Sequence, residues 1–157
     1  MKIYSQQDVH ALPLVKGVRH CRLGNYVDCK FDSHCKFPSG CTFDSSCKFA
    51  EGCTFDRHCK FDRACTFDSH CKFGEGCTFD RHCKFASLCT FASNCKFGGG
   101  CTFASNCEFG RVCTFGIYCK FDSYCTFDLG CELGDGCTFG DYCFFCEQLQ
   151  VWRRLPL

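Results

Sequence analysis

Residues 41–64 read CTFDSS CKFAEG CTFDRH CKFDRA, which is one six-residue unit written four times. The unit extends far beyond this stretch, because a cysteine recurs at every sixth position from Cys29 to Cys143. A phenylalanine stands two residues after each of these cysteines, with Leu133 as the one exception. A period this strict over most of the chain predicts a repeat architecture.

The Cys-x-Phe triplets are expected to form short β-strands. In an extended strand, Cys and Phe two residues apart point to the same face, and the residue between them points to the other. The three residues between successive triplets are turn-like, as in DSH at 32–34 and GGG at 98–100. All 13 glycines between residues 29 and 146 fall in these corners, where a positive φ is expected. The pattern predicts strands with Cys and Phe inside, joined by three-residue corners.

The middle residue of each strand sets the number of strands per coil. It is Thr at every twelfth position from Thr42 to Thr138, and mostly Lys at the positions between. Two or four units per coil would stack lysine on lysine about 4.8 Å apart, which is unfavourable. Three units per coil make the two residues alternate along a face, as in Lys48, Thr66 and Lys84. We therefore expect an all-β parallel β-helix, or β-solenoid, with triangular 18-residue coils from three hexapeptides and about 6–7 coils.

The inward side chains of stacked coils should form columns that make up the core. Burying each phenylalanine contributes roughly 2–3 kcal/mol. On one face the expected core ladder comprises Phe49, Phe67, Phe85 and Phe103 together with Cys47, Cys65, Cys83 and Cys101. Segments outside the array should cover the open strand edges. The chain thus divides into an N-terminal cap (1–28), a hexapeptide-repeat β-solenoid (29–145) and a C-terminal cap or tail (146–157).

Written from the phenylalanine, the unit is Phe-[Asp/Gly/Ala]-x-x-Cys-x, as in FDSHCK at 31–36. This resembles the hexapeptide repeat of left-handed parallel β-helices, in which an aliphatic residue precedes Gly, Ala, Glu or Asp and a small residue follows four positions later. The resemblance covers about 117 of the 157 residues and implies a left-handed helix. Phe replaces the aliphatic residue and Cys the small one, which makes each layer bulkier. The Cys-x-Phe array also resembles short uncharacterised bacterial and prophage proteins.

Composition narrows the range of functions. The formal net charge is +1, so no global field attracts nucleic acid or acidic lipid, and direct nucleic-acid binding is not expected. Residues 1–20 contain no apolar run long enough for a signal peptide, and no stretch could span a bilayer. We therefore expect a cytoplasmic, reducing location, in which the 22 cysteines are packing groups or ligands and not disulfides.

Catalysis is not expected. Many left-handed β-helix proteins are acyltransferases that use a histidine and a loop protruding from the prism, so the resemblance would imply the same chemistry. Here the hexapeptides run without an insertion, which leaves no loop to wall a cleft. The four corner histidines should face solvent without a carboxylate or thiol cluster; they are His34, His58, His70 and His82. No catalytic residue and no cofactor is predicted.

The residues are compatible with three other functions. Stacked thiols could bind soft metals, and Cys143 and Cys146 form the one CxxC motif, although the phenylalanine that accompanies each array cysteine suits packing as a small hydrophobe better than coordination. Beetle antifreeze proteins also space Cys by six beside Thr, but their coil has no room for two Phe, and lysines interrupt the threonines here. A partial DNA mimic would use an acidic strip made of Asp122, Asp128, Glu132, Asp135 and Asp141.

The interpretation that we favour is a rigid scaffold that binds a macromolecule. A straight solenoid displays its outward side chains on a fixed grid, which suits recognition of another protein. The C-terminal tail is expected to bind a partner or to form a homodimer contact, through Leu149, Val151, Trp152, Arg153, Arg154 and Leu155. The prophage resemblance implies that the partner is a host protein or protein complex, in defence or DNA processing, and that binding inhibits it.

Overall fold

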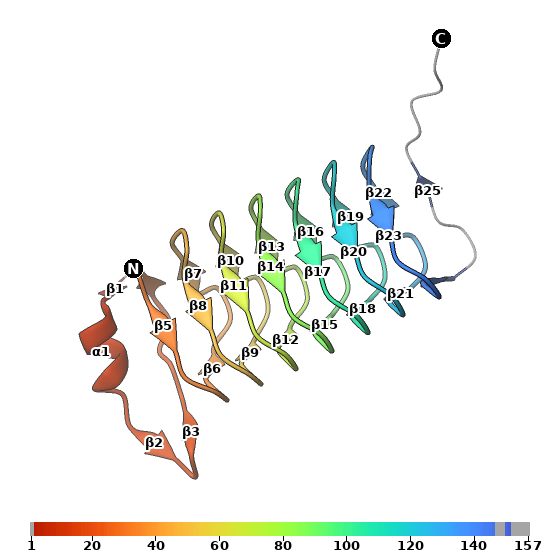
Figure 1. Ribbon diagram of the computed structural model, residues 1–157. Coiled ribbons are helices and arrows are strands. Elements are labelled where there is room, and N and C mark those ends of the chain that lie inside the picture. Colours follow the sequence, from red (N-terminus) through yellow and green to blue (C-terminus); the bar gives the residue numbers. More distant parts are fainter. Residues whose placement is uncertain (1, 147–149, 152–157) are drawn as a thin grey trace.

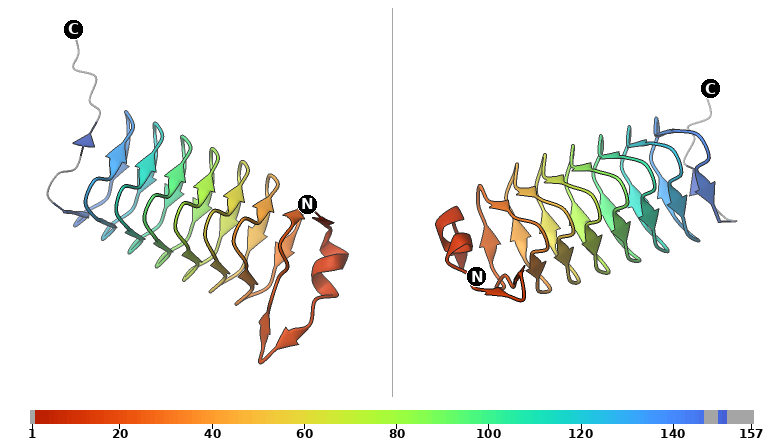
Figure 2. Two further views of the ribbon diagram at one scale, coloured as in Figure 1. Left: turned by 180° about the vertical axis from the view of Figure 1, so that it is seen from behind. Right: turned by 60° about the horizontal axis from the view of Figure 1, so that its bottom comes forward.

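The computed structural model describes residues 2–146 and 150–151, which form a parallel β-solenoid (Figure 1). Two-residue strands alternate with corners, and the stacked coils build a three-sided prism with α1 at one end and β24 at the other (Figures 1 and 2). The described residues contain one helix, α1 (Gln6–His10). The all-β solenoid with coils of about 18 residues is therefore confirmed. The left-handed winding implied by the resemblance stays a prediction.

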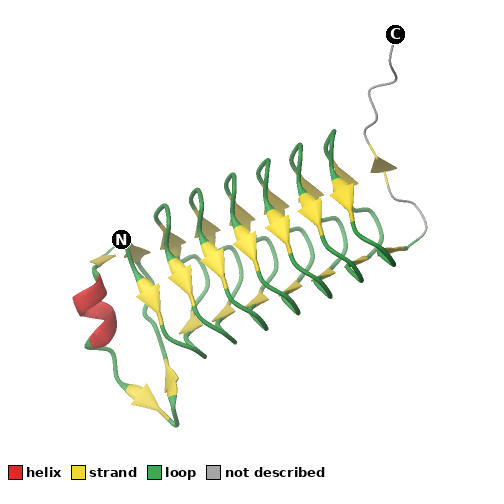
Figure 3. Ribbon diagram, in the orientation of Figure 1, coloured by secondary structure: helices red, strands yellow, loops and turns green. Residues whose placement is uncertain are grey.

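Each face of the prism is one parallel sheet, shown in yellow in Figure 3. Face 1 contains β1 (Ile3–Tyr4), β4 (Asn25–Tyr26), β7 (Thr42–Phe43), β10 (Lys60–Phe61), β13 (Thr78–Phe79), β16 (Lys96–Phe97), β19 (Thr114–Phe115), β22 (Glu132–Leu133) and β25 (Gln150–Val151). Face 2 contains β5 (Lys30–Phe31), β8 (Lys48–Phe49), β11 (Thr66–Phe67), β14 (Lys84–Phe85), β17 (Thr102–Phe103), β20 (Lys120–Phe121) and β23 (Thr138–Phe139). Face 3 contains β6 (Lys36–Phe37), β9 (Thr54–Phe55), β12 (Lys72–Phe73), β15 (Thr90–Phe91), β18 (Glu108–Phe109), β21 (Thr126–Phe127) and β24 (Phe144–Phe145).

The register between coils is the one that separates like charges. Thr66 pairs with Lys48 on one side and with Lys84 on the other. The same offset continues along face 2 as far as Thr138. Among the described strands, Lys30 beside Lys48 is the one lysine pair. Three units per coil, inferred from charge repulsion, are confirmed.

The core consists of aromatic columns and thiols. Phe49 and Phe67 on face 2 stack with ring centroids 4.8 Å apart and planes 3° apart. Phe55 on face 3 meets Phe49 edge-on, at 5.0 Å and 88°. Both arrangements are favoured for aromatic pairs. The predicted core ladder of face 2 is confirmed, because all of its members are buried: Phe49, Phe67, Phe85, Phe103, Cys47, Cys65, Cys83 and Cys101.

Three edges, each a column of corners, join the faces. Edge 1 (44–46 to 134–136) joins face 1 to face 2, edge 2 (32–34 to 140–142) joins face 2 to face 3, and edge 3 (38–40 to 128–130) joins face 3 to face 1. The third corner residue has a positive φ in every one of these corners, whether it is glycine or not. Glycines at the first corner position, such as Gly98, do not have a positive φ; a Cβ there would lie 2.8 Å from the nitrogen of Arg81. They permit a close approach of neighbouring coils.

The N-terminal segment extends the solenoid beyond the hexapeptide array. Tyr26 stacks between Tyr4 at 5.0 Å and Phe43 at 5.3 Å, so it continues the aromatic column of face 1. Tyr26 pairs with Phe43, which follows 17 residues later. This coil is one residue shorter than the 18-residue coils of the array, which places Tyr26 outside the six-residue period. With the strands added at both ends of face 1, the prism has about 8 coils, compared with the 6–7 expected from the array alone.

The N-terminal end of the prism is covered by α1 and by the hairpin of β2 (Leu14–Val15) and β3 (Val18–Arg19) (Figure 1). Val9 of the helix is buried. The guanidinium of Arg19 donates to the carbonyl oxygens of Val9 and Leu12, at 3.0 and 2.6 Å. These bonds satisfy carbonyl groups at the C-terminal end of the helix. No helix in the described part of the chain is long and apolar enough to cross a membrane.

Candidate functional site

Thiols line the interior of the prism. The array cysteines from Cys35 to Cys131 are 0 % exposed. From Cys53 onward, their S–H groups donate to the carbonyl of a first corner residue in the preceding coil, as Cys53 does to Asp32 and Cys65 to Asp44, each at 3.4 Å. Such weak hydrogen bonds give corner carbonyls a partner inside the core. The cysteines therefore act as small buried donors.

Burial and a neighbouring thiol keep two sulfurs near the N-terminal end of the prism protonated. Burial raises the pKa of Cys29 to about 11. A hydrogen bond with the thiol of Cys59, together with burial, raises the pKa of Cys41. The thiolate is the form that binds metals and attacks electrophiles, so Cys29 and Cys41 are poor ligands and poor nucleophiles at neutral pH.

The CxxC motif lies at the last coil of the array. Within residues 2–146 and 150–151, no group of three or more His, Cys, Asp or Glu side chains is placed to hold a metal ion. The thiol of Cys143 donates to the carbonyl oxygen of Asp122 at 3.3 Å. The backbone N–H of Cys146 donates to the carbonyl oxygen of Phe127 at 3.0 Å. The described structure thus supplies no third ligand for this pair.

The four corner histidines stand at the third corner position of different edges. His34 and His70 belong to edge 2, His58 to edge 3 and His82 to edge 1. Three of the rings lie where a Cβ on the glycine of the next coil would be, in the pairs His34 and Gly52, His58 and Gly76, and His82 and Gly100. The ring of His70 lies 3.8 Å from the carboxylate of Glu51. These contacts place the histidines as corner packing groups.

The five residues of the acidic strip occupy different parts of the prism. Asp122 and Asp141 belong to edge 2, and Asp128 to edge 3. Glu132 projects from face 1, and Asp135 from edge 1. Residues six positions apart lie on successive edges, so these carboxylates surround the C-terminal end of the prism and do not align along one edge.

The predicted tail site lies mostly outside the described residues. Backbone pairing of β25 with β22 places Gln150 opposite Glu132 and Val151 opposite Leu133. The other members of the predicted site are outside the described residues: Leu149, Trp152, Arg153, Arg154 and Leu155. Partner binding by this tail stays a prediction.

Exposed apolar side chains gather in the last coils of the prism. Between residues 29 and 111, one large hydrophobic side chain is exposed, that of Leu88. Between residues 112 and 146 the exposed ones are Val112, Ile117, Tyr118, Tyr124, Leu129, Phe139, Tyr142 and Phe144. Five of these surround the end of face 3, and we call them the C-terminal apolar surface: Val112, Tyr124, Leu129, Tyr142 and Phe144.

Phe144 is the centre of this surface. It is 63 % exposed and holds the outward position of β24, where other strands of the array carry Thr, Lys or Glu. Along edge 2, Tyr142 stacks on Tyr124 with ring centroids 5.2 Å apart. Val112 and Leu129 lie on edge 3, at the opposite border of face 3. Face 3 therefore ends in an aromatic residue flanked by apolar side chains on both edges.

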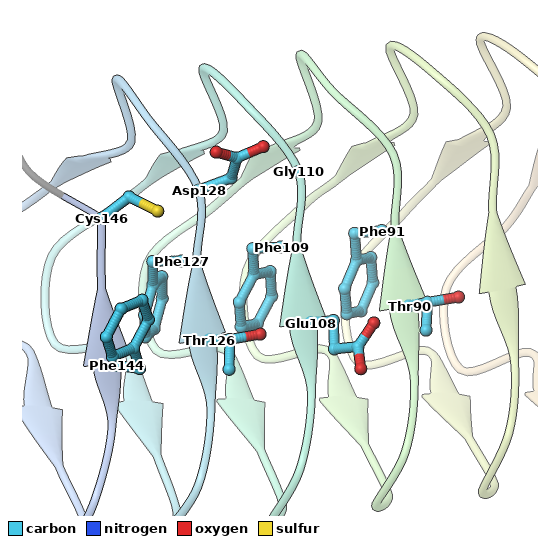
Figure 4. Close-up of a pocket in the computed structure, with 10 residues that line it drawn as sticks. All are labelled: Thr90, Phe91, Glu108, Phe109, Gly110, Thr126, Phe127, Asp128, Phe144 and Cys146. Atoms are coloured by element: carbon cyan, nitrogen blue, oxygen red, sulfur yellow. The ribbon is translucent and has the colours of Figure 1, made fainter.

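A hollow of about 400 Å³ lies on face 3 beside Phe144. Figure 4 shows Glu108 and Thr126 in one outward row with Phe144, and Asp128 on the far side of the hollow. The parallel rings of Phe109 and Phe127 lie behind the strands (Figure 4). The hollow thus combines one exposed ring with two carboxylates and two threonine hydroxyls, those of Thr90 and Thr126, which suits a partner that has both apolar and hydrogen-bonding groups.

The sequence contains a signal for this surface in the residue types of the outward positions. Phe144 occupies a middle strand position that the other units of the array fill with Thr, Lys or Glu. Tyr118, Tyr124 and Tyr142 occupy third corner positions, where the coils before residue 112 carry His, Gly, Asn, Ser, Ala or Leu. A comparison of equivalent positions along the chain would have found the change.

Comparisons of the chain with protein-family models, with curated proteins and with solved structures find no match. The assignment as a parallel β-solenoid with coils of three hexapeptides rests on the repeat and on the strand pairing.

Proposed function

We propose that this chain is a non-enzymatic, rigid β-solenoid that binds a protein partner through its C-terminal apolar surface. The observation that carries the proposal is the exposure of Phe144 and of the stacked Tyr124 and Tyr142 in coils whose interior matches all the others. Exposed apolar patches mark interaction sites. Aromatic residues are enriched in protein interfaces and supply much of their binding energy.

The scaffold supports binding because it holds these side chains in place. Each coil is hydrogen-bonded to its neighbours through strands and corners, as from the N–H of Phe144 to the carbonyl of Cys125 at 2.9 Å. Tyr142 is further restrained by its stack on Tyr124. Aromatic side chains have few rotatable bonds, and ordering them before binding reduces the entropy lost in the complex.

The partner that we propose is a cytoplasmic host protein or protein complex. This proposal is based on the resemblance of the Cys-x-Phe array to bacterial and prophage proteins. The same resemblance implies that binding inhibits a host protein of defence or DNA processing. A second copy of the chain is the alternative partner. Face 2 ends at β23 and face 3 at β24 among the described strands, and such strand edges can pair with another chain.

The test compares capture of a partner by variants of the purified full-length protein. Phe144→Thr and Tyr142→Ser remove two exposed rings, and Leu88→Ser removes the exposed apolar side chain of the middle coils as a control. We expect bacterial-lysate proteins retained by the natural chain to be lost with the first two variants and kept with the third. Equal retention by all variants contradicts the proposal. Light scattering identifies a homodimer, and a variant truncated after Cys146 tests the predicted tail site.

Metal analysis separates this proposal from a thiol-rich metal-binding solenoid. We expect near-zero zinc and copper in protein purified under reducing conditions, because the described thiols are buried donors without a group of three ligands. A stoichiometric metal content that survives dialysis would replace the binding-scaffold proposal with the metal-binding one.

A further inference from the structure

The last described strand of face 2 leaves part of the core without a cover. Phe139 of β23 is exposed and Cys137 beside it is partly exposed, whereas Phe121 and Cys119 one coil earlier are buried. The earlier strand β20 has a neighbour on both sides, but β23 has one neighbour among the described strands. An apolar ring and a thiol at a strand edge favour a further strand that buries them.

The chain after β24 returns to the prism in the register of the array. β25 pairs in parallel with β22, so that Gln150 lies opposite Glu132 and Val151 opposite Leu133. The offset is 18 residues, as it is between neighbouring coils of the array. The hexapeptide register therefore continues through β25 without an insertion or a deletion.

The same offset extends to the residues after β25, which lie outside the described part of the structure. It assigns 152–154 to the next corner of edge 1 and sets 155–157 opposite 137–139 of face 2. The two inward positions of that segment hold Leu155 and Leu157, where the array carries Cys and Phe. Apolar residues at both positions predict that the segment continues the core column of face 2.

An aliphatic residue is accepted in a phenylalanine column of this prism. Leu133 holds the Phe position of face 1 and is buried. By the same register, the inward positions of the next unit on that face hold Leu149 and Val151. Aliphatic residues at the last inward positions of face 1 thus match the two leucines expected on face 2.

Edge 1 offers this segment a hydrogen-bond partner and a charge partner. Along the edge, the N–H of a third corner residue donates to the carbonyl of the second corner residue in the next coil, as Tyr118 does to Asp135 at 2.9 Å. The same offset sets the N–H of Gly136 against the carbonyl of Arg153. Arg153 also stands one coil beyond Asp135, and neighbouring side chains of opposite charge attract. The corner residues of the segment therefore complement the edge that they would extend.

We propose that residues 152–157 of this chain dock on the outer side of β23, with Leu155 packed against Cys137 and Leu157 against the ring of Phe139. The two leucines shield the exposed ring and the thiol from water, which is the driving force for the contact. The contact forms within one chain and on face 2, whereas the proposed function uses the end of face 3. This inference therefore goes beyond the proposed function and does not depend on it.

The middle residue of the segment makes it easier to open than the strands of the array. Thr138 donates its N–H to the carbonyl of Cys119 at 3.0 Å. Pro156 holds the equivalent position and has no N–H, so it cannot donate to the carbonyl of Cys137. A terminal segment with fewer backbone bonds opens locally while the coils of the array stay closed. Small reagents therefore reach Cys137 through this opening.

The direct test is NMR of the full-length protein with isotope-labelled leucine methyl groups. We expect nuclear Overhauser contacts between the methyl groups of Leu157 and the ring of Phe139, in a sample that light scattering shows to be monomeric. Absence of these contacts overturns the proposal. Contacts that appear only at concentrations where the protein is dimeric also overturn it, because they identify a second copy of the chain as the occupant of β23.

The rate at which iodoacetamide labels Cys137 provides an independent measure. Leu157→Ser should make this reaction about tenfold faster than in the natural chain, because burial of a leucine side chain no longer holds the segment closed. Pro156→Ser changes the neighbouring outward position and is the matched control, which should not accelerate labelling. Phe144→Thr should leave the rate unchanged, and this separates the contact from the proposed function. An equal rate in Leu157→Ser and in the natural chain overturns the proposal.

Discussion

The middle coils (29–111) and the C-terminal coils (112–146) share the same inward columns of Cys and Phe, apart from Leu133, and have different exteriors. Phe67 in the middle stacks on its neighbours at 4.8 Å, and Phe127 near the end stacks on Phe145 at 4.7 Å. The outward positions change from lysine, threonine and small corner residues to Phe144, Tyr142 and Tyr124. The repeat therefore constrains the inner positions, because each one must fit a column, whereas an outward position has no such partner. Binding specificity can be carried by the outside without altering the fold.

The two regions also differ in how completely their cores are closed. Phe67 is 3 % exposed, whereas Phe139 in the last strand of face 2 is 38 % exposed. Each inner residue of a middle coil is covered by a coil on both sides, but β23 has one neighbouring strand among the described residues. The predictions that follow test this difference, beginning with the largest expected effect.

Thiol reactivity should divide the cysteines sharply. We expect iodoacetamide, with native protein at pH 8, to modify Cys137, Cys143 and Cys146, which are partly exposed, and to leave the buried cysteines of the middle coils unmodified. A second effect protects Cys29. Burial raises its pKa to about 11, so little of its thiol is ionised at pH 8. Mass spectrometry of digested protein locates the labels, and a urea-unfolded sample in which all cysteines react is the control. Rapid labelling of Cys65 or Cys83 would contradict a closed core.

Truncation of one phenylalanine should cost far more in the middle than at the end. We expect Phe67→Ala to lower the free energy of unfolding by about 3–5 kcal/mol, because it opens a cavity between two stacked rings. Phe139→Ala should lower the free energy of unfolding by about 1–2 kcal/mol, because its ring is partly exposed to water in the folded protein. Urea denaturation measures both. Equal losses would show that the end of face 2 is as well covered as its middle.

Removal of one thiol should show a smaller contrast in the same direction. Cys65→Ala deletes the S–H bond to the carbonyl of Asp44 and leaves a small void, so we expect a loss of about 1–2 kcal/mol. Cys143→Ala deletes a similar bond to Asp122 at a partly exposed position, and water can replace it, so the loss should be under about 0.5 kcal/mol. Denaturation midpoints of the two variants provide the measurement. A neutral Cys65→Ala would mean that the thiol is merely a space-filling group.

The smallest effect concerns the corners that hold a carboxylate and those that do not. Because the hydroxyl of Ser45 helps to lower the pKa of Asp62, Ser45→Ala should move that pKa upward. A folded-state pKa below the unfolded value contributes stability above the unfolded pKa, and this stability is lost as the pH falls through the folded pKa. Carboxyl-carbon NMR against pH measures the change, with Ser87→Ala on edge 2 as the control. An unmoved pKa of Asp62 in Ser45→Ala would refute the stabilisation of its charged form by the Ser45 hydroxyl.

Much of the fold could be predicted because the evidence for it is local and repeated. The Cys-x-Phe triplets identify the inner face, and the alternation of Lys48, Thr66 and Lys84 along face 2 identifies the coil length through charge repulsion. Tyr26 could not be predicted as a core residue, since its coil is one residue short and leaves the period. The sequence predicts positive φ in the corners, and the structure places it at the third corner position, which includes non-glycine residues such as His34.

The candidate site was less predictable. Asp122, Asp128 and Glu132 are close in the sequence, but they lie on edge 2, edge 3 and face 1 of the prism. Tyr124 and Tyr142 are 18 residues apart and stack. Sequence proximity in a solenoid therefore indicates separation around the axis, whereas separation by one whole coil indicates contact.

The amino-acid sequence by itself determined that this chain is a solenoid, because a six-residue period of paired inward side chains can bury its faces only by stacking coil on coil. It also determined three units per coil, through the repulsion of stacked lysines. The tertiary structure alone decided which outward residues meet, since that depends on where each corner lies around the axis. It assembled Tyr142, Phe144 and Leu129 into one surface, because this surface arises between coils and not along the chain.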